Sequence, residues 1–221
     1  KIEWGDFEAV KEVLIKIVNR VNIGKLASLG AERLARHFNA SSIAMTVKGL
    51  ELPAYDPREV YGQALAYATS NRGGCHLRSY MISMEVLGLP ILIERRTPMF
   101  KPDLVALNQD FLAVIDSLVL CKFITLELDD EFITHILTAV TGIEFDRGKL
   151  LRIGERIWNL ERLFNIREGF TKENDKLPSR LMREIPLSEM IEKYYEVRGW
   201  SSEGKPKLEK LKELDLEWVN I

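Results

Sequence analysis

The sequence has few cysteines, and this scarcity excludes several classes of protein. Only Cys75 and Cys121 occur in 221 residues, too few for the disulfide framework of a small secreted domain. Two cysteines also cannot complete a four-cysteine iron–sulfur cluster or a closed zinc site. Because no secretory signal opens the sequence, we expect a reducing, cytoplasmic location.

An excess of one charge and a long apolar run are also missing. The 31 basic and 33 acidic residues give a net charge of -2, so no basic field would attract nucleic acid or an anionic membrane. No apolar run approaches the ~20 residues of a membrane-spanning helix. Walker loops, dinucleotide fingerprints and nucleophile elbows are absent from the sequence as well. We therefore expect neither a nucleic-acid nor a membrane partner.

What the sequence does contain is helical periodicity and enough apolar residues, 46%, to bury a core. Apolar side chains recur at three- and four-residue intervals over most of the chain, which predicts an all-α fold. The expected helices cover residues 6–24, 25–38, 59–69, 75–87, 103–123, 131–140, 148–164, 187–197 and 208–214. A β-branched stretch at 42–50 predicts a short extended segment, and we place a domain junction there. The predicted domains are residues 1–45 and 46–221.

A glycine-containing turn at residues 70–78 (SNRGGCHLR) is the first candidate site. Adjacent glycines let backbone amides approach an anion closely, and Arg72 and Arg78 provide forked donors suited to phosphate. His76 stands at the start of the next expected helix, where this chemistry would converge. The alternative is a simple turn between helices with solvated arginines and a locally packed histidine, and the pattern leaves both interpretations open.

Asp116 and Cys121 are the second candidate site. An aspartate inside an apolar helix is costly unless a partner satisfies the carboxylate, and the neighbouring N–H donors of a pterin edge would do so. On a continuous helix the two side chains would point about 140° apart. For both to serve one site, the helix must end or bend between them, or the bound groups must lie on either side of it. The alternative is a free core cysteine and an aspartate bonded to a neighbouring helix.

Four stretches resemble the aldehyde:ferredoxin oxidoreductases, in the same order and at similar spacing. They are residues 47–58 (VKGLELPAYDPR), 67–78 (YATSNRGGCHLR), 116–123 (DSLVLCKF) and 154–170 (GERIWNLERLFNIREGF). The resemblance extends over essentially the whole chain and implies mostly helical domains that follow a β-rich one. It further implies oxidation of an aldehyde to a carboxylic acid at tungsten, sometimes molybdenum, held by two pterins. A 4Fe–4S cluster would pass the electrons to ferredoxin.

The resemblance also implies roles for individual residues. The family pattern Asp-x-x-Gly-Leu-Cys matches residues 116–121, with Asp116 as the pterin anchor, Leu120 as a main-chain contact and Cys121 as a thiolate ligand of the cluster iron. Val119 departs from the pattern, which has Gly at this position.

Two further roles follow from the glycine-containing turn. Arg72 and Arg78 would bind the phosphate region of the pterin, and His76 would lie beside the metal. A histidine there can donate a hydrogen bond to the aldehyde oxygen and so polarise the carbonyl group. Cys75 receives no role and is expected to pack in the interior.

Several parts of such an enzyme have no counterpart in this sequence. The other three cluster cysteines, the first pterin motif and a catalytic glutamate lie upstream in the family. We therefore interpret the chain as the last third of the enzyme, with residues 1–45 ending the middle domain. Alone it is expected to be inactive and to lack both cofactors, and its partners would be the missing N-terminal part, ferredoxin, an aldehyde and other copies in a homo-oligomer. Two alternatives are a separate N-terminal polypeptide and a helical scaffold without catalysis.

Overall fold

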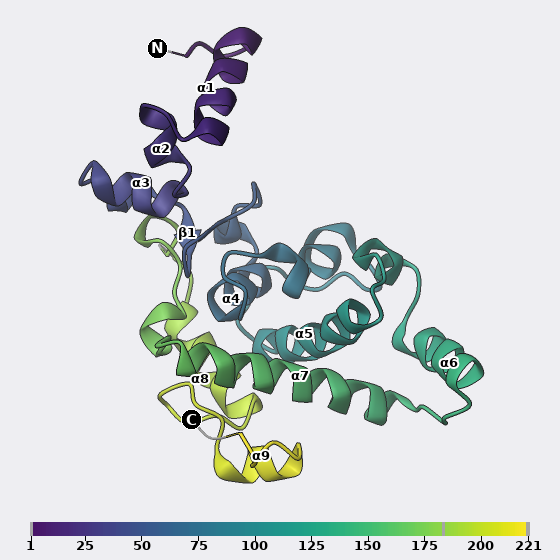
Figure 1. Cartoon of the computed structure of the whole chain (residues 1–221). Coiled ribbons are helices and arrows are strands. Elements are labelled where there is room, and N and C mark those ends of the chain that lie inside the picture. Colours follow the sequence, from purple (N-terminus) through teal and green to yellow (C-terminus); the bar gives the residue numbers. More distant parts are fainter. Residues whose placement is uncertain (1, 183, 220–221) are drawn as a thin grey trace.

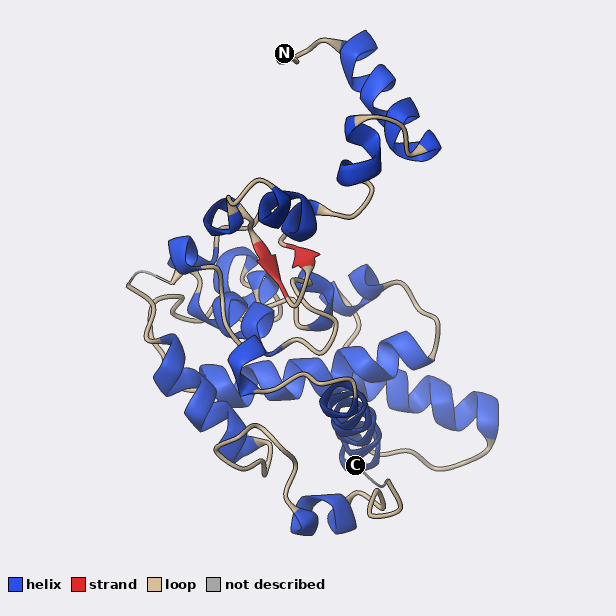
Figure 2. Ribbon diagram, turned by 60° about the vertical axis from the view of Figure 1, so that its left-hand side comes forward, coloured by secondary structure: helices blue, strands red, loops and turns tan. Residues whose placement is uncertain are grey.

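A computed structural model of the chain describes residues 2–182 and 184–219. The α-helices are α1 (Phe7–Asn19), α2 (Ile23–Ala27), α3 (Ala31–His37), α4 (Tyr61–Thr69), α5 (Lys101–Ser117), α6 (Asp130–Thr141), α7 (Arg147–Arg167), α8 (Leu187–Val197) and α9 (Leu208–Glu213). Short 3-10 helices are η1 (Ser41–Ile43), η2 (Pro57–Glu59), η3 (His76–Arg78), η5 (Lys122–Leu126), η6 (Lys172–Asn174) and η7 (Ser179–Leu181), and η4 (Ser83–Leu87) is a π-helix. Strands β1 (Thr46–Val47) and β2 (Leu50–Glu51) form one antiparallel hairpin. The predicted all-α class is confirmed (Figures 1 and 2).

Several of the expected helices are shorter than the periodicity predicted; the one expected at 6–24, for example, ends at Asn19. Three others show why. The helix expected at 25–38 is divided into α2 and α3 at Gly30, whose φ of 86° is left-handed. The one expected at 75–87 is divided by Ser79, which is extended and donates its hydroxyl to Asn108. The third, expected at 103–123, ends at Ser117. In each case a local backbone feature or a tertiary contact outweighs helical periodicity.

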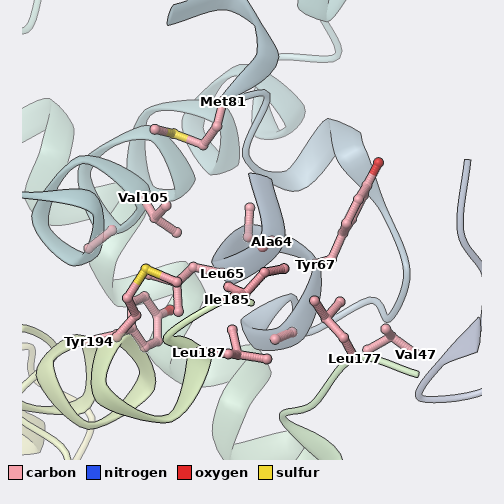
Figure 3. Close-up of a cluster of buried hydrophobic side chains, with 14 of the residues drawn as sticks. Val47, Ala64, Leu65, Tyr67, Met81, Val105, Leu177, Ile185, Leu187 and Tyr194 are labelled. Carbon is pink, nitrogen blue, oxygen red and sulfur yellow. The ribbon is translucent and has the colours of Figure 1, made fainter. Parts of the chain in front are cut away.

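The core lies where α5 and α7 cross, with α4 and α8 packed against α5 (Figure 1). Its buried apolar residues extend from Val47 to Trp200 in sequence, and Figure 3 shows how side chains from distant segments, including Leu65, Val105 and Tyr194, meet. No residue of the segment 2–45 belongs to this cluster. The domain boundary predicted at 45–46 stays a prediction, although Val47 is the first residue along the chain that packs in this core.

A buried arginine connects two of these helices. Arg198 follows α8 and is 1% exposed, and its guanidinium donates to the Asp110 carboxylate at 2.6 Å and to the Gln109 side chain at 2.8 Å. The hydroxyl of Tyr194 lies between them, accepting from Arg198 and donating to Gln109. Since a buried charge is costly without partners, this network fixes the orientation of α8 on α5.

A second buried group of charges attaches the hairpin to the body. Lys48, in the turn of the hairpin, contacts Asp175 at 2.8 Å, and Arg162 of α7 contacts the other carboxylate oxygen at 2.7 Å. All three side chains are at most 2% exposed. Burial alone would raise the pKa of Asp175, but the two cations outweigh it and lower the pKa.

Helices α1 and α2 extend away from this body, and α3 lies beside the β1–β2 hairpin (Figures 1 and 2). Helix α1 has no buried residue, and its apolar side chains, including Phe7, Val10, Leu14 and Val18, line a shallow groove of about 320 Å³. Among the described residues, no helix combines the length and the apolar character needed to cross a membrane.

Replacement of Gly154 by Ala tests the helix contact at the centre of the core. A Cβ atom at this position of α7 would lie 2.0 Å from the Asp110 carbonyl oxygen of α5, so the helices would have to separate. We expect Gly154→Ala to reduce the free energy of unfolding by about 3 kcal/mol, measured by urea denaturation.

Gly148, in the first turn of the same helix, provides the matched control. A Cβ atom there would approach only the Asp146 side chain, at 3.2 Å. Gly148→Ala should be neutral or stabilising by up to ~1 kcal/mol. Equal effects of the two substitutions would contradict the close packing.

Candidate functional site

The glycine-containing turn packs against the β1–β2 hairpin. Gly73 has a φ of 102°, and a Cβ atom there would lie 2.7 Å from the Val47 carbonyl oxygen. At Gly74 a Cβ atom would lie 2.6 Å from the Leu50 carbonyl oxygen, and its N–H donates to Val47 at 3.1 Å. The glycines therefore allow the turn to approach the hairpin, and the amide of Gly74 is engaged within the protein, not free for an anion.

His76 lies in a cluster of aromatic rings. The ring centroids of Tyr55 and Tyr80 are 5.3 and 5.8 Å from that of His76, and the two phenol oxygens are 3.4 Å apart. Partial burial and the nearby Arg72 lower the pKa of His76, so the imidazole is neutral at pH 7 and can donate one hydrogen bond. Burial and the bond to Tyr55 raise the pKa of Tyr80 to about 12. The sequence analysis missed both tyrosines, because no motif spacing links them to His76.

Arg78 and Arg72 have different surroundings. Arg78 is 8% exposed and donates to Asp116 at 2.9 Å and to Glu161 at 2.6 Å, with its guanidinium 5.1 Å from the Trp158 ring centroid. Arg72 is exposed. Both line a groove of about 390 Å³ with Asn71, Leu160, Glu161, Phe164 and Asn165. Phosphate binding by either arginine stays a prediction, and Arg78 already has carboxylate partners at both terminal nitrogens.

The end of α5 has the geometry of a Schellman motif, a helix-terminating turn with two characteristic backbone bonds. The N–H of Leu120 donates to Ile115 at 3.2 Å, and the N–H of Val119 donates to Asp116 at 3.0 Å. Val119 takes the left-handed position with a φ of 57°. The motif normally has Gly here, which is the residue that the family pattern carries at this point.

The turn brings Asp116 and Cys121 into a common region without a continuous helix. Asp116 lies in the last turn of α5, and Cys121 is extended and exposed at the start of η5. The N–H of Leu120 donates to Ile115 within the turn. The main-chain contact with the pterin that was predicted for Leu120 would therefore have to use its carbonyl oxygen. Cys75, in contrast, is buried, as expected.

Lys122 is a site residue that the sequence analysis missed. Its ammonium group contacts Asp116 at 2.8 Å and the Leu112 carbonyl oxygen at 3.4 Å. Burial lowers the pKa of Lys122, while Asp116 opposes this effect. The only feature of the sequence that could have identified Lys122 is its position directly after Cys121. A lysine in a turn ordinarily predicts a solvated side chain.

The chain on its own offers few metal ligands. Within residues 2–182 and 184–219, no group of three or more histidine, cysteine or acidic side chains is arranged to hold a metal ion. An exposed thiol such as Cys121 can supply a single ligand, and a four-cysteine cluster would take its remaining ligands from elsewhere. The donor set therefore fits one corner of a shared cluster site.

Replacement of Val119 by Gly should relieve strain in the turn. A β-branched residue in the left-handed region costs ~1–2 kcal/mol, so we expect Val119→Gly to raise the free energy of unfolding by about 1 kcal/mol, measured by urea denaturation. Val140, equally exposed but inside α6, is the matched control. Val140→Gly should be destabilising by a few tenths of a kcal/mol, and stabilisation by both changes would contradict the proposed strain.

Replacement of Arg72 by Gln should raise the pKa of His76. Burial is the larger cause of the lowered pKa and Arg72 the smaller, so the variant should recover only part of the shift. Because the unfolded state binds the proton more tightly, the contribution of His76 to stability is lost as the pH falls below ~6.5. NMR titration of the ring protons measures the pKa of His76, with His37 and His135 as internal references. An unchanged or lower pKa in Arg72→Gln would exclude the role of Arg72.

Comparisons with known proteins identify the family of the chain. Residues 1–216 match the family described as "Aldehyde ferredoxin oxidoreductase, domains 2 & 3". The tungsten-containing aldehyde ferredoxin oxidoreductases of Pyrococcus furiosus and Pyrococcus horikoshii are 42% and 43% identical over 96% and 97% of this chain. Each match covers 37% of the relative, so the chain spans only about a third of their length.

Two further proteins match nearly the whole chain, one in sequence and one in fold. The P. furiosus protein named "Aliphatic sulfonate oxidoreductase, WOR-like subunit" is 26% identical over 98% of this chain and 36% of its own length. A solved structure, the active site complex BamBC of benzoyl coenzyme A reductase with 1,5-dienoyl-CoA, matches with a TM-score of 0.74 and 21% identity. It covers 93% of this chain and 38% of that chain, and it shows the shared fold alone. From the family match and the closely similar Pyrococcus enzymes, we conclude that the chain belongs to the aldehyde ferredoxin oxidoreductase family.

Proposed function

We propose that this chain forms one wall of the active site of a tungstopterin aldehyde:ferredoxin oxidoreductase. Such an enzyme oxidises an aldehyde with water to a carboxylic acid and passes the electrons through a 4Fe–4S cluster to ferredoxin. The observation that carries the proposal is the turn after α5, which presents a half-buried carboxylate, Asp116, and an exposed thiol, Cys121, on either side of a left-handed residue. A helix that continued would have separated them.

Asp116 is suited to hold the edge of a pterin. Its Oδ2 atom accepts from Arg78 and Lys122, so the orientation of the carboxylate is fixed. For Oδ1 the described part of the chain records no partner, which leaves it to accept the N–H donors of a pterin ring. Cys121 would supply one thiolate to the cluster, and the exposed Arg72 would reach the pterin phosphate.

His76 is proposed as the hydrogen-bond donor at the substrate. The bound tungsten–pterin group supplies the two-electron oxidation and the path for the electrons. A neutral imidazole in the aromatic cluster can donate to the aldehyde oxygen, which makes the carbonyl carbon more susceptible to attack by water. The lowered pKa of His76 keeps it neutral for this task. Tyr55 and Tyr80 lie against the ring and would help to orient it.

The remaining parts of the site are proposed to lie in an N-terminal region that completes the enzyme. Support comes from the relatives, of which the chain covers 37%, and from α1, whose apolar residues are exposed along a groove. A further chain segment packed on this groove would remove apolar surface from water. Without that region we expect the chain to hold neither cofactor and to be inactive. We further infer a cytoplasmic location, where both free cysteines would stay reduced.

The exchange of Cys121 for Ser tests the proposal. In the enzyme assembled from this chain and the preceding region, Cys121→Ser should remove a strong ligand, so that the iron content falls and the electron paramagnetic resonance signal of the reduced cluster is lost. Cys75→Ala, at the other and buried cysteine, is the matched control and should keep both. Normal iron content and an unchanged signal in Cys121→Ser would refute the assignment.

The chain alone provides a second measurement. Metal analysis of the purified 221-residue protein should find no stoichiometric tungsten and no complete cluster, since the described residues supply one thiolate on an exposed turn. A chain that carried both metals and oxidised aldehydes by itself would contradict the proposal that other segments complete the site.

A further inference from the structure

Lys122 has an unusual position for a lysine beside an exposed turn. Its side chain is only 12% exposed and reaches back under the end of α5, whereas Cys121, one residue earlier, is exposed. The ammonium contacts the Asp116 Oδ2 atom at 2.8 Å and the Leu112 carbonyl oxygen at 3.4 Å. The backbone that carries the thiol is therefore tied to the carboxylate by the next side chain.

A second cation approaches the same carboxylate oxygen. Arg78 donates to Oδ2 of Asp116 at 2.9 Å and, through its other terminal nitrogen, to Glu161 of α7 at 2.6 Å. The four side chains form a balanced network of two cations and two carboxylates. Both bonds to Oδ2 are charge-assisted, and such bonds are roughly twice as strong as neutral ones. Together they hold the carboxylate in one orientation. The Asp116 side chain nevertheless stays 35% exposed.

We propose that Lys122 is a positioning residue that holds Asp116 and Cys121 in one fixed arrangement before any cofactor binds. That the arrangement serves cofactor binding rests on the proposed function, whereas the contacts of Lys122 are independent of it. Lys122 acts through two neighbours: its ammonium orients Asp116, and its fixed position holds the backbone from which the adjacent Cys121 side chain extends. Sites of this kind bind well when the supporting residues lock the binding groups in advance.

The simpler alternative is that Lys122 only caps the helix. A cation near a helix C-terminus interacts favourably with the helix dipole, and Lys122 lies just beyond the end of α5, although the carbonyl group of α5 that it contacts, that of Leu112, lies inside the helix. A cap would depend on the positive charge near the helix end and not on Asp116. The two roles therefore differ in whether the effect of Lys122 requires the carboxylate.

Amide hydrogen exchange of the 221-residue chain separates these roles. The amides of Leu120, Ile124 and Glu127 are hydrogen-bonded within residues 115–127 and report on the turn. We expect Lys122→Met to increase their exchange rates roughly tenfold, as expected for loss of a charge-assisted bond. Lys122→Arg should restore them to within about twofold. Lys193→Met, at an exposed pair with Glu196, is the matched control and should change nothing.

Asp116→Asn keeps the test decisive if Lys122→Met unfolds part of the chain. It should accelerate exchange of the same amides, and the double variant should be no faster than Asp116→Asn alone, because that substitution already removes the charged partner of Lys122. Additive effects of the two substitutions would show that Lys122 acts only as a cap and would overturn the proposal. Equal acceleration by Lys122→Arg and Lys122→Met, or no acceleration, would overturn it as well.

The pterin content of the assembled enzyme tests whether the contact between Lys122 and Asp116 affects cofactor binding. Released pterin, oxidised and measured by fluorescence, should fall several-fold in Lys122→Met and be retained in Lys122→Arg. Undiminished pterin in Lys122→Met would overturn the positioning role. Wild-type protein without any pterin would instead refute the proposed function, while the exchange measurements on the chain would still decide the contact made by Lys122.

Discussion

The approach of α5 and α7 at Gly154 determines where the residues of the candidate site lie. The Asp110 carbonyl group of α5 occupies the space that a side chain would take. From this point Asp116 is six residues further along α5, and Glu161 is seven further along α7, about 10 Å in each helix. Arg78 bridges the two carboxylates. Gly154 sets how closely α5 and α7 approach, and thereby the distance between the carboxylates of Asp116 and Glu161. The Arg78 guanidinium has to span this distance.

Buried charges maintain this arrangement on both sides of the crossing. Arg198 connects α8 to α5 through Asp110, and Arg162 connects α7 to the hairpin through Asp175. Buried pairs of this type often add little net stability, because desolvation offsets much of their attraction. Breaking one partner is costly, however, so each pair penalises any packing in which its helices are displaced. Here the buried pairs contribute to the specificity of helix packing around α5 and α7, more than to the free energy of unfolding.

The helical class could be predicted because apolar periodicity is a local property of the sequence. The end of the helix at Ser117 was not predicted, because the apolar periodicity continues to residue 123. The spacing of Asp116 and Cys121 implied only that a helix on which both serve one site would have to end or bend between them. The partners of Arg78 could not be predicted, since Glu161 is 83 residues away and no pattern connects the two. The glycines of the turn were misleading for a related reason: their freedom serves the distant hairpin. Lys122 escaped notice because burial of its ammonium depends on tertiary structure.

The buried lysine of the hairpin turn has a consequence for how stability is distributed along the chain. Lys48 secures the hairpin to Asp175, whereas helix α1 has no buried residue. Local opening requires little free energy where few apolar contacts are lost. Fluctuations that unravel α1 would therefore stop at the hairpin and leave the crossing helices undisturbed. Opening of α1 alone would thus leave the shape of the wall that carries Asp116 unchanged.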